Sequence, residues 1–132
     1  MIGYVARRVV SIPVAVALLL AHGAAGAGDR MAVQHTRQPA GVEGGLEYAY
    51  TFRVTKRGSG DPVDGAAFSI ATDMPSMPGA HHMPHVAGES TGEPGTYTAE
   101  IEFDMPGEWN LILRFSEPFR DQVVISDMIE KQ

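Results

Sequence analysis

The chain of 132 residues contains no cysteine, and this absence excludes several classes of chemistry. Disulfide bonds, thiolate metal sites, cysteine nucleophiles and a lipidated N-terminal cysteine all require a thiol. Basic charge is also scarce, because 10 Lys and Arg residues stand against 16 Asp and Glu residues, for a net charge of −6. Nucleic-acid binders need a basic patch, so this composition argues against a nucleic-acid partner.

Long apolar runs are missing as well, and the longest lies near the N-terminus. Residues 9–21 follow Arg7 and Arg8 and are too few for a transmembrane helix, which needs about 20 apolar residues. Small residues come next and end in Ala-Gly-Ala at 25–27, an A-x-A cleavage pattern. We therefore expect residues 1–27 to be a signal peptide and the protein to be periplasmic or secreted. An uncleaved membrane anchor is the alternative.

Residues 28–132 are expected to form one domain. Arg7 and Arg8 would leave with the signal peptide and no acidic residue would, which takes the net charge from −6 to −8. A domain of this size buries about 65% of its unfolded surface, enough for one hydrophobic core. Without disulfides, its stability has to come from a regularly packed fold, which a bound metal could assist.

The apolar residues of this domain alternate with polar ones, and no amphipathic helix pattern occurs. In residues 46–55, for example, Tyr48, Tyr50 and Phe52 share one face while polar residues occupy the other. This period of two predicts strands with one buried face. Strands are predicted at residues 31–35 (weakly), 46–55, 96–103, 109–115 and 120–126, and a further strand is predicted within residues 62–72, with Phe68 and Ile70 on one face.

Turns rich in Gly and Pro separate these strands, as at residues 56–61 and 104–107. The pattern predicts an all-β fold, an immunoglobulin-like antiparallel β-sandwich of about 6–8 short strands, with a small barrel as the alternative. Trp109 heads an apolar alternation and is expected in the core. Glu100 and Glu102 share a face, which we interpret as the solvated outer face of a sheet rather than an acid–base pair.

One segment, residues 73–85, departs from this pattern, and we name it the Met/His loop. It holds three of the seven Met, three of the five His and three Pro residues. Proline disfavours both a regular helix and a central strand, so we expect a stiff loop that joins two strands. A stiff backbone loses less entropy when it closes on a ligand.

Thioether and imidazole donors, without any thiolate, favour copper. The sequence therefore predicts copper as the bound metal. The candidate ligands are Met74, Met77, His81, His82, Met83 and His85. Zinc is less favoured, because its usual donors are Cys, His and carboxylate, although the three His residues with Asp73 could serve.

A structural interpretation of the same loop stays open. Methionine is a flexible gap-filler, so Met74 and Met77 could plug one end of the sandwich. His81 and His82 are adjacent and would point in opposite directions in extended backbone. The domain would then be a structural or protein-interaction module. Nucleophile motifs and glycine-rich phosphate loops are absent from the sequence, so we expect no enzymatic activity.

Three stretches carry a resemblance to a known family. They are residues 74–84 (Met-Pro-x-Met, then His-Met-Pro), 92–97 (Gly-Glu-Pro-Gly-Thr-Tyr) and 103–109 (Phe-Asp-Met-Pro-Gly-Glu-Trp). Over residues 43–128 the chain resembles the YtkA-like domain family, which is related to FixH-like proteins. The matching candidate ligands are Met74, Met77, His82 and Met83, whereas His81 and His85 are added from their chemistry.

The resemblance implies a small extracytoplasmic immunoglobulin-like sandwich that occurs alone or beside heavy-metal efflux or copper-handling proteins. It implies a copper-binding module that acts as chaperone, buffer or efflux accessory, with such a protein as its partner. FixH-like relatives are membrane-anchored and linked to cytochrome oxidase maturation. That role is the alternative, although the short apolar run of this chain does not match their anchor.

Overall fold

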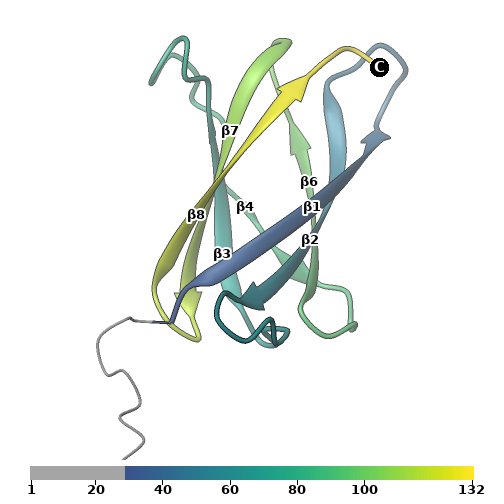
Figure 1. Ribbon diagram of the computed structural model, residues 1–132. Helices are drawn as coiled ribbons and strands as arrows, with labels where there is room; N and C mark the ends of the chain where they lie inside the picture. The colour runs from purple at the N-terminus through teal and green to yellow at the C-terminus, as the bar shows by residue number, and fades with distance from the viewer. Residues whose placement is uncertain (1–28) are drawn as a thin grey trace, which may run out of the picture.

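Eight strands form two antiparallel four-stranded sheets that face each other (Figure 1). The structure is a computed structural model that describes residues 29–132, so the predicted signal peptide lies outside the described residues. The strands are β1 (Met31–Ala40), β2 (Glu47–Lys56), β3 (Ala67–Asp73), β4 (Val86–Ala87), β5 (Glu89–Ser90), β6 (Thr96–Glu102), β7 (Gly107–Glu117) and β8 (Asp121–Ile129). Within residues 29–132, no helix is long and apolar enough to cross a bilayer.

The order of the strands confirms the immunoglobulin-like topology. One sheet has the order β1-β2-β6-β5 and the other has the order β4-β3-β7-β8. If all strands except β4 are lettered A to G in chain order, the first sheet is the A-B-E-D sheet of an immunoglobulin domain. The second is the C-F-G sheet, to which β4 is added beside C. The chain therefore forms two separate layers, and the closed single sheet considered as an alternative is not the observed fold.

Strict alternation located the long central strands correctly. β2, β6 and β7 lie where the apolar pattern placed them, with ends shifted by one or two residues. β1 is longer than the predicted 31–35, because it pairs with β2 along its entire length from Met31 to Ala40. β4 and β5 were not predicted, since two residues carry no readable period.

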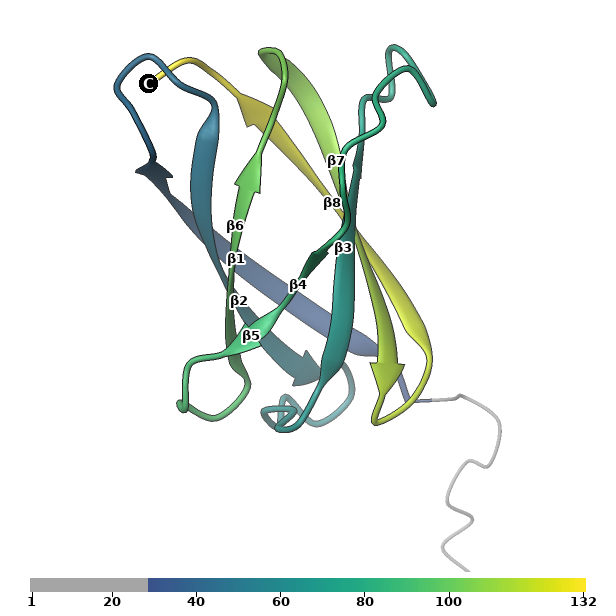
Figure 2. The ribbon, with the colours of Figure 1, turned by 180° about the vertical axis from the view of Figure 1, so that it is seen from behind.

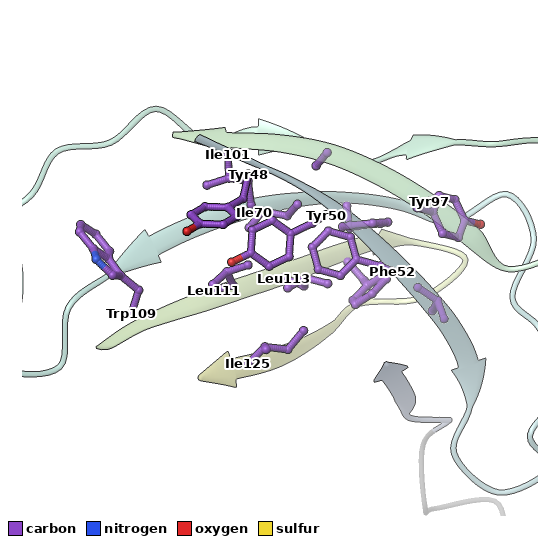
Figure 3. Close-up of a cluster of buried hydrophobic side chains, with 14 of the residues drawn as sticks. Tyr48, Tyr50, Phe52, Ile70, Tyr97, Ile101, Trp109, Leu111, Leu113 and Ile125 are labelled. Atoms are coloured by element: carbon purple, nitrogen blue, oxygen red, sulfur yellow. The ribbon is translucent and has the colours of Figure 1, made fainter. Parts of the chain in front are cut away.

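The core lies between the sheets and is rich in aromatic residues. Tyr50 and Phe52 of β2 are fully buried and stack with their ring centroids 5.7 Å apart. Trp109, also fully buried as predicted, lies at one end of this cluster, and Tyr97 lies at the other (Figure 3). Glu100 and Glu102 are exposed on the outer face of β6, as expected for a solvated sheet face.

The side of the sandwich between β1 and β8 is closed by polar side chains, which we name the Asp127 latch. Oδ2 of Asp127, on β8, lies 2.7 Å from Nη1 of Arg37 on β1 and accepts a hydrogen bond of 2.7 Å from the hydroxyl of Tyr50 on β2. The Arg37 guanidinium also lies over the Tyr48 ring, 4.7 Å from its centroid. Burial, together with Asp127, raises the pKa of the Tyr50 hydroxyl.

The opposite side is closed by the chain itself, which crosses from one sheet to the other (Figure 2). β4 pairs with β3, β5 pairs with β6, and Gly88 stands between β4 and β5. The Gly88 N–H donates to the Phe68 carbonyl at 3.1 Å. A Cβ atom at residue 88 would lie 2.2 Å from the Phe68 ring, so this crossing requires glycine.

Candidate functional site

The Met/His loop follows β3 at one end of the sandwich and leads to β4, which confirms that it joins two strands (Figure 1). Two consecutive turns fold it. The Met77 N–H donates to the Met74 carbonyl at 3.0 Å, and the Ala80 N–H donates to the Met77 carbonyl at 3.1 Å. The Asp73 carboxylate accepts a further bond of 3.1 Å from the Gly79 N–H, so the loop has a defined path despite its exposure.

The loop docks on the turn between β6 and β7. Met74 is 4% exposed, and its methyl group lies against Gly107, where an added Cβ atom would be 2.7 Å away. Nδ1 of His81 lies 2.6 Å from Oδ2 of Asp104. The His81 ring is tilted against Trp109, with 5.0 Å between the ring centroids. Met74 and His81 therefore anchor the loop to the same turn.

Trp109 gives this turn a rigid base. Its indole N–H donates to the Met105 carbonyl at 3.0 Å, four residues upstream. In immunoglobulin domains a tyrosine near the start of the corresponding strand makes a similar bond back to the upstream backbone. Here the indole of Trp109 holds the β6–β7 turn in place, and this turn positions Asp104 next to His81.

His81 is more buried than the other histidines of the loop. Its side chain is 11% exposed, and its Nε2 atom is covered and has no hydrogen-bond partner within residues 29–132. With the Nδ1 proton assigned to the bond with Asp104, Nε2 carries a free lone pair. A carboxylate that orients one ring nitrogen while the other binds a metal is the usual arrangement of a histidine ligand.

The other predicted ligands lie in different surroundings. Met77 is 37% exposed, His82 and His85 are exposed, and Met83 packs half-buried against the core. His81 and His82 diverge as their adjacency predicts, one toward Trp109 and the other into solvent. The structure thus brings Met74 and His81 to one turn and leaves three of the six predicted ligands at the surface.

The zinc alternative lacks a matching geometry. Within the described part of the chain, no three His, Asp or Glu side chains come together closely enough to hold one metal ion. Asp73 caps the loop through the Gly79 N–H instead, and His81 pairs with Asp104. The sequence analysis missed Asp104 and Trp109 as partners of His81. The signal that could have found them is the Met-Pro-Gly-Glu-Trp motif of this turn, at residues 105–109.

Acidic residues surround this end of the sandwich. Negative potential of this kind raises the local concentration of cations. The Asp104 carboxylate pairs with His81. The acidic side chains at the strand ends and loops are Glu43, Glu47, Asp73, Glu102, Asp104, Glu108 and Glu130.

Comparison with known families settles the identity of the domain. The sequence model described as YtkA-like matches residues 28–114, about two thirds of the chain. The chain belongs to the YtkA-like family. The YtkA-like match begins earlier than the predicted residue 43 and ends within β7 rather than at residue 128. It includes both the Met/His loop and the β6–β7 turn. No characterised protein and no solved structure matches the chain.

Proposed function

We propose that this YtkA-like protein binds copper reversibly outside the cytoplasm, without catalysing a reaction, with His81 as the anchoring ligand. The observation that carries the proposal is the buried Nε2 atom of His81, which has no hydrogen-bond partner in residues 29–132. Asp104 holds the opposite ring nitrogen, and the acidic end of the sandwich attracts cations. A bound ion would give Nε2 the partner that it lacks.

The methionines of the loop would supply the remaining donors. Met77, at 37% exposure, is the thioether that an arriving ion meets first, whereas Met74 is buried against Gly107. Because Nε2 is covered, binding requires a local movement that exposes this atom. Thioether donors favour Cu(I) and imidazole also accepts Cu(II). Handover would then go to a copper-handling or efflux protein.

A competition titration of the purified protein with Cu(I) tests this proposal. Trp109 is the single tryptophan of the chain and lies against His81, so its fluorescence reports binding at this site. We expect His81→Gln to weaken copper binding by at least about 10-fold. The matched control is His82→Gln, which alters the exposed neighbour and should change affinity by less than about twofold.

The proposal fails if the wild-type protein binds copper no more tightly than a variant that combines His81→Gln with Leu at Met74, Met77 and Met83. Leucine keeps the volume of methionine, so this variant should fold. Asp104→Asn should give an intermediate loss of copper affinity, because removal of the carboxylate that orients a ligand lowers metal affinity by about 10- to 100-fold.

A structural or protein-interaction module is the second candidate, and the burial of Met74 favours it. Met74 fills the core beside Gly107 and Met83 packs against the same core, as the gap-filling interpretation predicts. Under this alternative, which includes a FixH-like role in cytochrome oxidase maturation, copper leaves the melting temperature unchanged. A ligand that binds only the native state must raise it.

A further inference from the structure

β6 is fully paired on one side and only partly paired on the other. β2 pairs with β6 from Thr96 to Glu102, whereas β5 pairs with it only at Tyr97 and Thr98. Within residues 29–132, no strand pairs with residues 99–102 of β6 on the side where the chain crosses between the sheets. Residues 99–102 of β6 therefore form a free sheet edge.

The hydrogen-bonding groups of this edge point outward. The Thr91 N–H donates to the Thr96 carbonyl at 3.1 Å, so Thr96 directs its main chain toward the β5 side. Residues of an antiparallel strand alternate in the direction of these groups, so Glu100 and Glu102 direct theirs to the same side. Each presents one N–H donor and one carbonyl acceptor without a strand to receive them.

A cleft lies beside this edge, on the side where β4 and β5 cross between the sheets (Figure 2). It has a volume of about 280 Å³ and lies between Ile101 of β6 and the end of the Met/His loop at Met83 and Pro84. Val86 and Glu100 connect it to a second recess of about 490 Å³. The Thr72 hydroxyl, which is buried and has no partner in the described residues, belongs to a residue of the cleft wall.

The charges around the cleft all have one sign. The two recesses are lined by four glutamates and by no Lys, Arg or His residue. None of these carboxylates takes part in an ion pair within residues 29–132, where the ion pairs use Asp104, Asp121 and Asp127. The four residues are Glu47, Glu89, Glu100 and Glu102.

This charge decides between occupants of the edge. A second copy of the chain that paired with β6 in antiparallel fashion would place Glu100 and Glu102 opposite glutamates, which is destabilising. Charged side chains, most often lysine, and proline are the usual protection of an exposed edge, and residues 99–102 carry glutamate as their only charged residue type. Glutamate instead attracts a strand that carries basic residues.

We propose that residues 99–102 of β6 dock an extended, Lys- or Arg-containing segment of a partner protein by β-strand addition. Main-chain bonds to Glu100 and Glu102 would supply affinity. Side chains on an added strand alternate between the two faces. Basic residues of the docked segment would meet Glu100 and Glu102 on the outer face. The apolar residues that alternate with them in the segment would enter the cleft toward Met83 and Ile101. The docked segment therefore alternates basic and apolar residues.

A synthetic peptide that alternates lysine and valine over seven residues tests this proposal by NMR titration of the full protein. We expect the largest shifts, and slowed hydrogen exchange, at the amides of Glu100 and Glu102. The double variant Glu100→Gln with Glu102→Gln should weaken binding by at least about fivefold. The matched control, Glu93→Gln with Glu117→Gln at exposed positions elsewhere, should leave it unchanged.

Main-chain pairing is tested by N-methylation of the backbone amides of the lysines. In an antiparallel added strand these residues lie opposite Glu100 and Glu102 and direct their N–H groups toward β6, so methylation removes the donors and keeps the charge. The proposal predicts that the methylated peptide loses binding. It is overturned if both peptides bind equally, if the shifts map to another face, if neither peptide binds, or if the protein dimerises through this edge. His81→Gln should bind the unmodified peptide normally, so this result is independent of copper binding.

Discussion

The two sides of the sandwich where the sheets part are closed by different means. Between β1 and β8, the Asp127 latch joins the sheets through side chains whose polar groups bind one another. On the other side, the backbone crosses at Gly88 and leaves the edge of β6 beside a cleft. Closure by side chains uses the polar groups of the sheets, whereas closure by the backbone keeps main-chain groups available to a partner. The free edge of β6 accordingly lies next to the crossing.

The crossing depends on a glycine, so it should be the more fragile closure. We expect Gly88→Ala to lower the free energy of unfolding by about 3 kcal/mol, because the added methyl group collides with the Phe68 ring. Urea denaturation measures this loss. Gly58→Ala is the control, since nothing lies within 4 Å of its Cβ position, and it should cost less than about 0.5 kcal/mol. Equal losses would show that the crossing is not tightly packed.

The latch should respond to loss of its shared acceptor. Asp127→Ala leaves both Arg37 and the Tyr50 hydroxyl without their partner, and we expect a loss of about 2 kcal/mol in urea denaturation. Tyr50→Phe removes only one bond and should cost about 1 kcal/mol. If Tyr50→Phe proves the more costly change, Asp127 is not the centre of the latch.

High pH should weaken the latch without affecting the crossing. Burial and Asp127 raise the pKa of Tyr50 above its usual value of about 10. The unfolded chain therefore loses this proton first, so stability is full below pH 10 and falls as the pH rises further, by about 1 kcal/mol per unit. Unfolding at pH 9 to 11 measures the slope, which should be flatter in Tyr50→Phe. An unchanged slope in that variant would assign the loss to other groups.

The smallest effect concerns the cleft wall. Thr72→Val replaces a buried hydroxyl that has no partner in the described residues, so we expect a gain of about 1 kcal/mol. Thr98→Val, at an exposed position of β6, is the control and should change stability by less than about 0.5 kcal/mol. A loss in Thr72→Val would indicate that water or a ligand pairs with the hydroxyl.

The strands could be predicted wherever inward positions are apolar, as in β2 and β7. β1 exceeded its prediction because two of its inward-facing residues, His35 and Arg37, are polar and break the apolar alternation. Both side chains point inward because they pair with Asp127 on β8, which lies about 90 residues away in the sequence and forms no local pattern with them. β4 and β5 depend on the crossing geometry at Gly88 rather than on any local pattern.

The candidate site divides in the same way. Composition identified the Met/His loop, and proline content identified it as a loop between strands. The role of each residue within it depends on the β6–β7 turn, 23 residues away in the case of His81 and Asp104. No local pattern distinguishes the anchored His81 from the exposed His82, because only tertiary contact with Trp109 separates them.

The position of β1 determines how the loop is presented. The Met31 N–H donates to Asp121, which pairs with Phe115 near the far end of β7, whereas Met74 contacts Gly107 at the near end. β7 has 11 residues, which span about 35 Å. If the chain before Met31 is held at a surface, the sandwich acts as a spacer that carries the Met/His loop about 35 Å from the point of attachment, facing outward.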